Sequence, residues 1–316
     1  MSKEQFSDHD LARFKQAQRL AYDAVTHVEK ELYEGITEKE AAAKIERWLR
    51  DHGVTNFFHY GFAWFGERAA FRGFMRLADN AIFTNLIPHF GKQFQPSNRK
   101  LRKGDSVILD VAPAIGDIAV DMGYACSLGE SEALHDARMA LEPHRELILS
   151  MVKAGKTQRD IYAAVDRLIA EQGYEAAHSF YPNAVLGHKV GRYPMPMLQL
   201  PRVLGFGPQA LVYLGNHVAH KALHPKANAM PIWNMHSNVP CEPGLWAVEP
   251  HIGKGDVGAK WEELLVVTED TAYWLDDDLA HHRYWKEHRS AHPAHTATGE
   301  LQAARGAAPR LGRSLG

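Results

Sequence analysis

The sequence predicts a protein of the α+β class, with amphipathic helices and with strands, two of which could form an antiparallel hairpin. Apolar residues recur at helical spacing in two parts of the chain, before residue 55 and again between 131 and 172. Short apolar runs bounded by turn residues lie between and after these helices, as is typical of strands. The 316 residues are enough for one large domain or two ordinary ones.

Two helices are predicted at the start of the chain. The first is capped by Ser7 or Asp8 and carries apolar residues at helical spacing from Leu11 to Val28. The second begins at the capping box Thr37-Glu38-Lys39-Glu40 and ends near His52-Gly53. The aromatic-rich segment 55–73 that follows fits neither a helix nor a strand pattern clearly.

Strands and further helices are predicted in the middle and last thirds. Ser106–Val111 follows the turn signal Lys103-Gly104-Asp105, and Asp117–Ala125 comes soon enough after it to form a hairpin. Ala81–Thr84 is a weaker strand candidate. Helical patterns then cover 131–153 and 158–172, with Thr157 as the cap of the latter. Two further strands are predicted, at Leu245–Glu249 and Glu263–Val267.

A proline-rich segment and a polar tail depart from this pattern. Residues 194–243 hold 8 of the 16 prolines, a density that excludes a long helix, so we expect an ordered loop or insertion there. Residues 290–316 are rich in Ala, Gly, Arg and His, and we expect them to be mostly disordered. The predicted organisation is therefore a single domain over 1–289, including the insertion, followed by a tail.

Composition excludes several classes of protein. The formal charge of −2 argues against a nucleic-acid binder, and the apolar runs are too short to cross a membrane. The polar start MSKEQFSDHD has no signal-peptide core, so we expect a cytoplasmic protein. Two cysteines cannot form a disulfide framework, whereas 19 histidines hint at metal or acid–base chemistry.

Four acids and one histidine stand out because each lies at or beside a predicted strand. Asp110 ends the strand Ser106–Val111, Asp121 lies eleven residues later in its hairpin partner, and His188 follows Leu186-Gly187. Glu249 and Glu262 end and begin the last two predicted strands. Any one of these acids could simply mark a strand end at water. Together they suit two divalent cations, because carboxylates can bridge cations, an imidazole can fill a terminal position, and the four negative charges balance.

The stretches around these residues resemble the pita-bread metallopeptidases, the family of methionine aminopeptidases, aminopeptidase P and prolidase. The resemblance spans roughly residues 10–275 and rests on stretches that occur in family order: GDSVILDV at 104–111, Asp121, LGHKVGR at 186–192, GLWAVEP at 244–250 and GAKWEELLVVTED at 258–270. It implies a curved antiparallel sheet flanked by two pairs of helices.

The resemblance also assigns roles. It implies that Asp110 chelates one metal ion, that Asp121 and Glu262 bridge two ions, and that His188 and Glu249 complete the coordination. Glu249 would in addition handle the proton of the metal-bound water. His89, in Ile87-Pro88-His89-Phe90, would be a catalytic histidine that contacts the substrate. The ions expected are two of Mn²⁺, Co²⁺, Fe²⁺ or Zn²⁺.

The departures from the family pattern lie on the substrate side. Family peptidases carry a second histidine seven residues after the metal histidine, where this chain has Met195. Residues that could fold back to fill that role are His217, His220, His224 and His236, and it is equally open that none does. A glycine common after the metal histidine is replaced by Lys189, and Met122-Gly123-Tyr124 stands where a hydroxyl often orients the bridging acid.

We therefore expect a dinuclear metallohydrolase of amide C–N bonds, most simply an aminopeptidase of the Xaa-Pro type. The substrate would be a peptide or a small non-peptide amide, with no nucleic-acid or membrane partner, and the insertion could form a lid or a homodimer surface. The alternative from another class is a binding protein that keeps the fold without hydrolysis.

Overall fold

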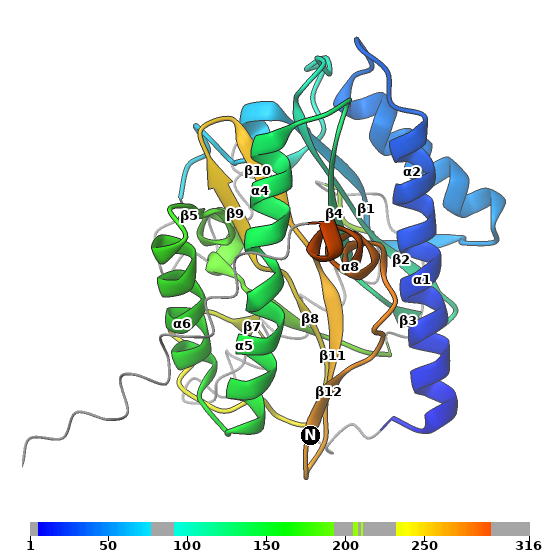
Figure 1. Ribbon diagram of the computed structural model, residues 1–316. Helices are drawn as coiled ribbons and strands as arrows, with labels where there is room; N and C mark the ends of the chain where they lie inside the picture. The colour runs from blue at the N-terminus through cyan, green and yellow to red at the C-terminus, as the bar shows by residue number, and fades with distance from the viewer. Residues whose placement is uncertain (1–5, 77–91, 193–204, 208–209, 211–231, 292–316) are drawn as a thin grey trace, which may run out of the picture.

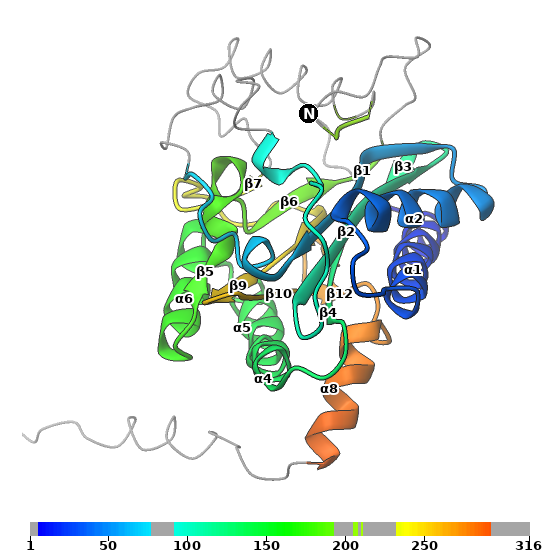
Figure 2. The same ribbon diagram turned by 90° about the horizontal axis from the view of Figure 1, so that it is seen from above.

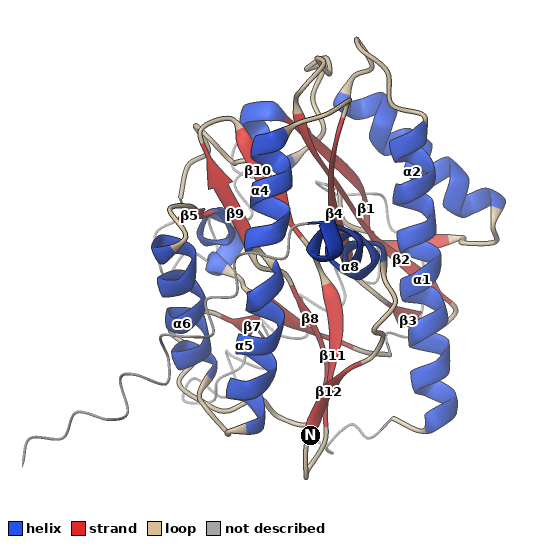
Figure 3. Cartoon of the chain, in the orientation of Figure 1, coloured by secondary structure: helices blue, strands red, loops and turns tan. Residues whose placement is uncertain are grey.

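The computed structural model describes residues 6–76, 92–192, 205–207, 210 and 232–291. Helices flank a strongly twisted set of antiparallel strands, and the two helical groups lie on opposite flanks of the strands (Figures 1 and 3). Helices α1 (Asp8–Lys30) and α2 (Glu38–Asp51) lie on one flank. The other flank has α4 (Glu132–Ala140), α5 (Glu142–Lys153) and α6 (Gln158–Glu171), as Figure 2 shows from above. This confirms the predicted α+β class.

The predicted helix starts are confirmed by their caps. Ser7 accepts from the backbone of Asp10 at the start of α1, and Thr37 accepts from Glu40 at the start of α2, each as a reciprocal capping box. Thr157 caps α6 as expected. The helical pattern predicted over 131–153 is confirmed, but as two helices, because the chain breaks at Leu141 between α4 and α5, with a proline in the first turn of α5.

The predicted hairpin forms the first sheet. Strand β2 (Ser106–Ile115) pairs with β1 (Asn56–Phe65) on one side and with β3 (Ile118–Ala119) and β4 (Met122–Ser127) on the other. The aromatic-rich segment that sequence patterns left undecided is therefore a strand, β1, followed by the short helix η1 (Gly66–Arg68). The candidate strand Ala81–Thr84 lies outside the described residues.

Two further sheets come from the second half of the chain. One has the order β12-β11-β8-β6-β7, built from β6 (Gly187–Val190), β7 (Ile232–Trp233), β8 (Gly244–Val248), β11 (Glu263–Val267) and β12 (Ala272–Trp274). The other has the order β10-β9-β5, built from β5 (Glu175–Ala176), β9 (His251–Lys254) and β10 (Val257–Lys260). Short helices η3 (Ala177–Phe180) and η4 (Pro182–Ala184) lead into β6.

Two buried cores tie the helices to the strands. One contains side chains of α1 and α2 packed against β1, β2 and β4, and the other joins α4–α6 to β8–β12. The last helix, α8 (Ala280–Ala291), places Trp285 in the second core. Because α8 runs to Ala291, the described fold extends slightly past the predicted boundary at 289; the rest of the predicted tail lies outside the described residues.

The predicted insertion is described only in part. Residues 205–207, 210 and 232–243 are placed, and Tyr60 donates its backbone N–H to the Gly205 carbonyl at 2.8 Å. In the part of the chain that is described, no helix is both long and apolar enough to cross a bilayer.

A buried carboxylate joins α2 to the first sheet. Glu38, fully buried at the start of α2, accepts from the Phe65 backbone at 3.0 Å, from the Arg68 guanidinium at 2.9 Å and from Ser97 Oγ at 2.7 Å. A buried carboxylate with this many donors is stabilising only while all its partners remain.

We predict that Glu38→Ala lowers the free energy of unfolding by about 3 kcal/mol, because Arg68 loses its buried counter-charge. Chemical denaturation measures the change. The matched control is Lys39→Ala, at the exposed neighbouring position of α2. Equal stability of the two variants would contradict the assigned role of Glu38.

Candidate metal centre

The structure brings together the five residues singled out in the sequence. Asp110 lies within β2, Asp121 between β3 and β4, His188 in β6, Glu249 directly after β8 and Glu262 between β10 and β11. The four acids are buried and His188 is half-buried. The expectation that Asp110 ends its strand is wrong, because β2 continues to Ile115. Asp110 therefore lies in the middle of a buried strand and not at a strand end exposed to solvent.

Strand register explains why the acids share one face. Asp110 pairs with Gly123 in β4, so Asp121, two residues before Gly123, points to the same side of the hairpin. In the second sheet His188 pairs with Ala247, and Glu249, two residues further on, again shares that face. The sheets meet at a bridge between Tyr124 and Trp261, next to Glu262.

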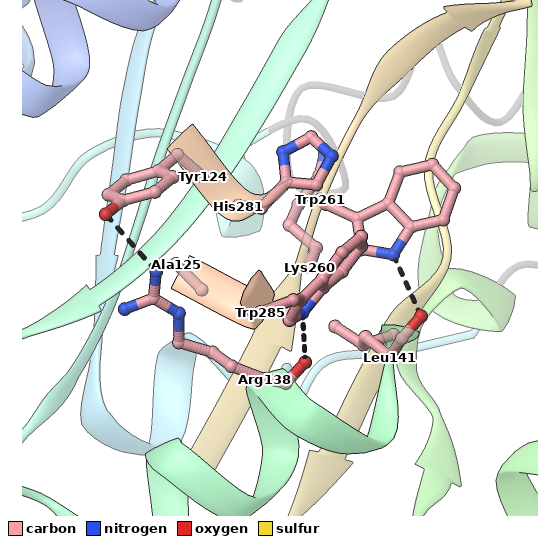
Figure 4. A pocket seen from close by; sticks show the side chains of 8 residues that line it. All are labelled: Tyr124, Ala125, Arg138, Leu141, Lys260, Trp261, His281 and Trp285. Carbon is pink, nitrogen blue, oxygen red and sulfur yellow. Dashed lines mark hydrogen bonds between the residues drawn. The ribbon is translucent and has the colours of Figure 1, made fainter. Parts of the chain in front are cut away.

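Trp261 points to the opposite side of the chain from its neighbours Lys260 and Glu262, because successive side chains in an extended segment alternate between two faces. Its indole N–H donates to the Leu141 carbonyl at 3.2 Å, and its ring stacks on His281 of α8. Figure 4 shows the small pocket at this place, lined also by Arg138 and Trp285. Trp261 therefore packs against the helices, while its neighbours Lys260 and Glu262 face the acid cluster.

Lys260 is the residue that sequence reasoning missed and that dominates the electrostatics of the site. Its fully buried Nζ lies 2.6 Å from Asp110 Oδ2, 2.9 Å from Glu249 Oε2 and 3.0 Å from Glu262 Oε2. Lys260 precedes Glu262 by two residues, and the period of two in a strand was a signal that could have placed it on the same face.

Gly123 makes room for this lysine. A Cβ atom at Gly123 would overlap the aliphatic part of the Lys260 side chain. The glycine in Met122-Gly123-Tyr124, noted above as a departure from the family pattern, thus leaves the space through which Lys260 reaches Asp110.

His59 is the second residue that sequence reasoning missed. Its Nε2 lies 2.8 Å from Asp121 Oδ1 and 3.3 Å from Asp110 Oδ1. The only sequence signal was a histidine among the aromatic residues of 55–73, and without the strand register nothing related it to Asp121.

Burial and charge pull the pKa values of the site in different directions. Burial raises the pKa of Glu249 to about 8, although Lys260 opposes this, and it raises the pKa of Asp110 to about 6. Burial alone would lower the pKa of His59, but Asp121 and Asp110 raise it to about 9. Burial would raise the pKa of Asp121, yet His59 and His188 hold it well below its usual value.

The donor set fits divalent cations. Three overlapping groups each place their ligand atoms within 4.8 Å of one another: His59 with Asp110 and Asp121, Asp121 with His188 and Glu262, and Asp110 with Glu249 and Glu262. Glu262 Oε1 is buried without a hydrogen-bond partner, 3.7 Å from His188 Nε2. A buried carboxylate oxygen with no donor is costly, and a cation between it and the imidazole would satisfy it.

A second cluster of possible metal ligands does not fit a divalent cation in the same way. Glu263 accepts from His281 and His282 at 3.2 Å each, and Arg145 donates to it at 2.7 Å. Because the guanidinium already neutralises Glu263, we interpret this cluster as a hydrogen-bonded support for the neighbouring Glu262.

The remaining predicted residues are not placed at the site. His89, Met195, His217, His220 and His224 lie outside the described residues. His236 is exposed in the loop after β7 and belongs to none of the ligand groups among the described residues. The substrate-side roles of these histidines stay predictions.

The chain belongs to Metallopeptidase family M24, which it matches over residues 12–269. Among curated proteins it is similar to an uncharacterized peptidase of Staphylococcus aureus (strain bovine RF122 / ET3-1), with 25% identity over 187 residues, 58% of this chain and 46% of the relative. The chain thus spans about half the length of the curated relatives it matches.

Solved structures share the fold. An X-Pro aminopeptidase from Thermotoga maritima MSB8 superposes with a TM-score of 0.59 at 19% identity, covering 86% of this chain and 62% of that one. A prolidase from Pyrococcus furiosus gives a TM-score of 0.57 at 19% identity, covering 85% and 64%. The pita-bread fold expected from the sequence is therefore confirmed.

We predict that Lys260→Met destabilises the metal-free protein by about 3–5 kcal/mol, because three buried carboxylates lose their shared counter-charge. Added Co²⁺ should then raise the melting temperature more in the variant than in the wild type, since it replaces the missing charge. Thermal unfolding with and without Co²⁺ measures both effects, with Lys103→Met, in an exposed turn, as the control. If the melting temperatures of Lys260→Met and the wild type agree, the assigned role of Lys260 is wrong.

Proposed function

We propose that this protein is a metal-dependent peptidase that uses two divalent cations to hydrolyse an amide C–N bond at a peptide N-terminus, with Xaa-Pro peptides as the first substrates to test. The observation that carries the proposal is the convergence of Asp110, Asp121, His188, Glu249 and Glu262 in one buried cluster. Family membership supports a metallopeptidase, and the structural similarity to the X-Pro aminopeptidase from Thermotoga maritima suggests Xaa-Pro peptides.

The five residues would share the cations as the family pattern implies. Asp110 would bind one cation, His188 and Glu249 the other, and Asp121 and Glu262 both. Two divalent cations would polarise the substrate carbonyl and lower the pKa of the attacking water. Manganese, cobalt, iron and zinc are all compatible with a donor set of this kind.

Glu249 is the residue suited to move the proton. A carboxylate beside the attacking water can accept a proton from it and release that proton to a leaving group. Glu249 would take a proton from the attacking water and pass it to the leaving nitrogen. Lys260, bonded to Oε2 of Glu249 at 2.9 Å, would hold the carboxylate in place. His89 would stabilise the developing oxyanion, as the family resemblance implies.

One observation favours a second candidate, a binding protein without hydrolysis. The ammonium group of Lys260 already bridges three of the four carboxylates, so the cluster is partly neutralised without a metal. A small non-peptide amide remains a further candidate substrate for the hydrolase. Metal binding separates the hydrolase from the binding protein.

We predict that the 316-residue chain binds two equivalents of Mn²⁺ or Co²⁺ and that Asp110→Ala and Glu262→Ala each lose at least one equivalent together with peptidase activity. Equilibrium dialysis with elemental analysis measures the metal, and release of the N-terminal residue from Xaa-Pro and Xaa-Ala peptides measures activity. The control is Asp270→Ala, an exposed acid in the turn between β11 and β12. Full activity in either ligand variant would sink the proposal, and a wild type that binds no metal would favour the binding protein.

For Glu249→Gln we expect turnover to fall by at least about 100-fold, because an amide cannot accept the proton from the attacking water. The circular dichroism spectrum should be unchanged, since the amide fills the same space. Steady-state kinetics under saturating Co²⁺ measures the loss. Retention of more than a tenth of wild-type turnover would mean that another group moves the proton.

A further inference from the structure

His59 lies in β1, at an irregular point of the strand. The pairing of β1 with β2 shifts register on both sides of His59, between Phe57 and His59 and between His59 and Phe62. Bulges of this kind re-aim side chains and are common beside active sites. The imidazole also stacks on Phe62, with ring centroids 5.0 Å apart, and meets the edge of Phe206 at 6.2 Å.

The hydrogen bond at Nδ1 determines which form of the ring faces the acids. Nδ1 lies 2.9 Å from the Tyr60 carbonyl, which can only accept, so Nδ1 carries a hydrogen. A neutral His59 then presents a lone pair at Nε2 to Asp121 Oδ1 and Asp110 Oδ1. A lone pair facing two carboxylate oxygens is repulsive, so a cation must lie there, either a proton or a metal ion.

The arrangement of His59 parallels that of His188. The Nε2 atom of His188 lies 3.3 Å from Asp121 Oδ2, whereas that of His59 faces Asp121 Oδ1. Each ring also has its Nδ1 near the carbonyl of the next residue, Tyr60 or Lys189. A main-chain carbonyl at the far nitrogen is the usual orienting contact of a metal-binding histidine. The two oxygens of Asp121 therefore face two imidazoles from two separate strands.

We propose that His59 is a sixth metal ligand, which binds one divalent cation through Nε2 together with Asp110 and Asp121, so that each cation has one imidazole. This inference rests on the proposed two-metal site and adds to it a ligand from β1. Imidazole favours Zn²⁺, Fe²⁺ and Co²⁺ over Mn²⁺ relative to an all-oxygen position. The position bound by His59 should therefore prefer these ions.

The test is calorimetric titration of Co²⁺ into the chelator-stripped 316-residue chain, comparing the wild type with His59→Phe and His59→Gln. The Phe variant suits the aromatic surroundings, and the Gln variant keeps a polar group toward Asp121. We expect one of two Co²⁺ sites to weaken by at least about tenfold in both variants. His144→Gln is the control, because His144 is a buried imidazole bonded to Gln172 and away from the acids. Unchanged affinities in both His59 variants would overturn the proposal.

X-ray absorption of the Zn²⁺-loaded wild type gives an answer that needs no variant. The proposal predicts an average of one imidazole per zinc, because His59 and His188 each bind one ion. An average near one imidazole for every two zinc ions would leave His59 as a hydrogen-bond partner of Asp121 and overturn the proposal. If the wild type takes up no Co²⁺ or Zn²⁺, the proposed function itself is contradicted. If the wild type binds metal but His59 is not one of the ligands, only this inference is contradicted.

Discussion

The structure depends on keeping four carboxylates close together in a buried place. Asp110, Asp121, Glu249 and Glu262 lie where solvent cannot screen them, and each would repel the others if left alone. Lys260 offsets one of the four negative charges, and its Nζ contacts three of the acids. Two divalent cations would more than offset the other three, leaving a site that favours the negative charge that develops on a carbonyl oxygen during amide hydrolysis.

The antiparallel sheets are what make this cluster possible. Side chains two residues apart on paired strands share a face, so five strands or strand ends can each deliver one ligand to the same place. The helices on both flanks fix those strands from outside, as the packing of Trp261 against α8 and the α4–α5 junction demonstrates. At Gly123 the absence of a side chain leaves room for Lys260, which crosses this position.

Much of the fold could be predicted because local signals were strong. The capping boxes at Ser7 and Thr37 and the apolar run before Asp110 determine their elements without help from distant residues. Lys260 and His59 were missed for a different reason. The spacing of two residues between Lys260 and Glu262 indicates a shared face, but the contacts of Lys260 with Asp110 and Glu249 depend on strands that are distant in sequence. A histidine among aromatics carries no local signature, and the role of His59 arises only from the register of the bulged β1.

The boundaries of some strands and helices differ from those that the sequence predicted. Pairing with β1 and β3 carries β2 past Asp110 to Ile115, which the hydrophobic pattern of 106–111 alone did not indicate. The break at Leu141 depends on the proline that follows in α5, a signal present in the sequence but weaker than the continuous helical pattern around it.

The most direct test of the central claim is a crystal structure of the Zn²⁺-soaked protein with anomalous diffraction measured at the zinc edge. The account predicts two anomalous peaks inside the acid cluster, one beside His188 and one beside Asp110. Absence of anomalous density in the cluster, with Lys260 still bonded to Asp110, Glu249 and Glu262, would contradict it.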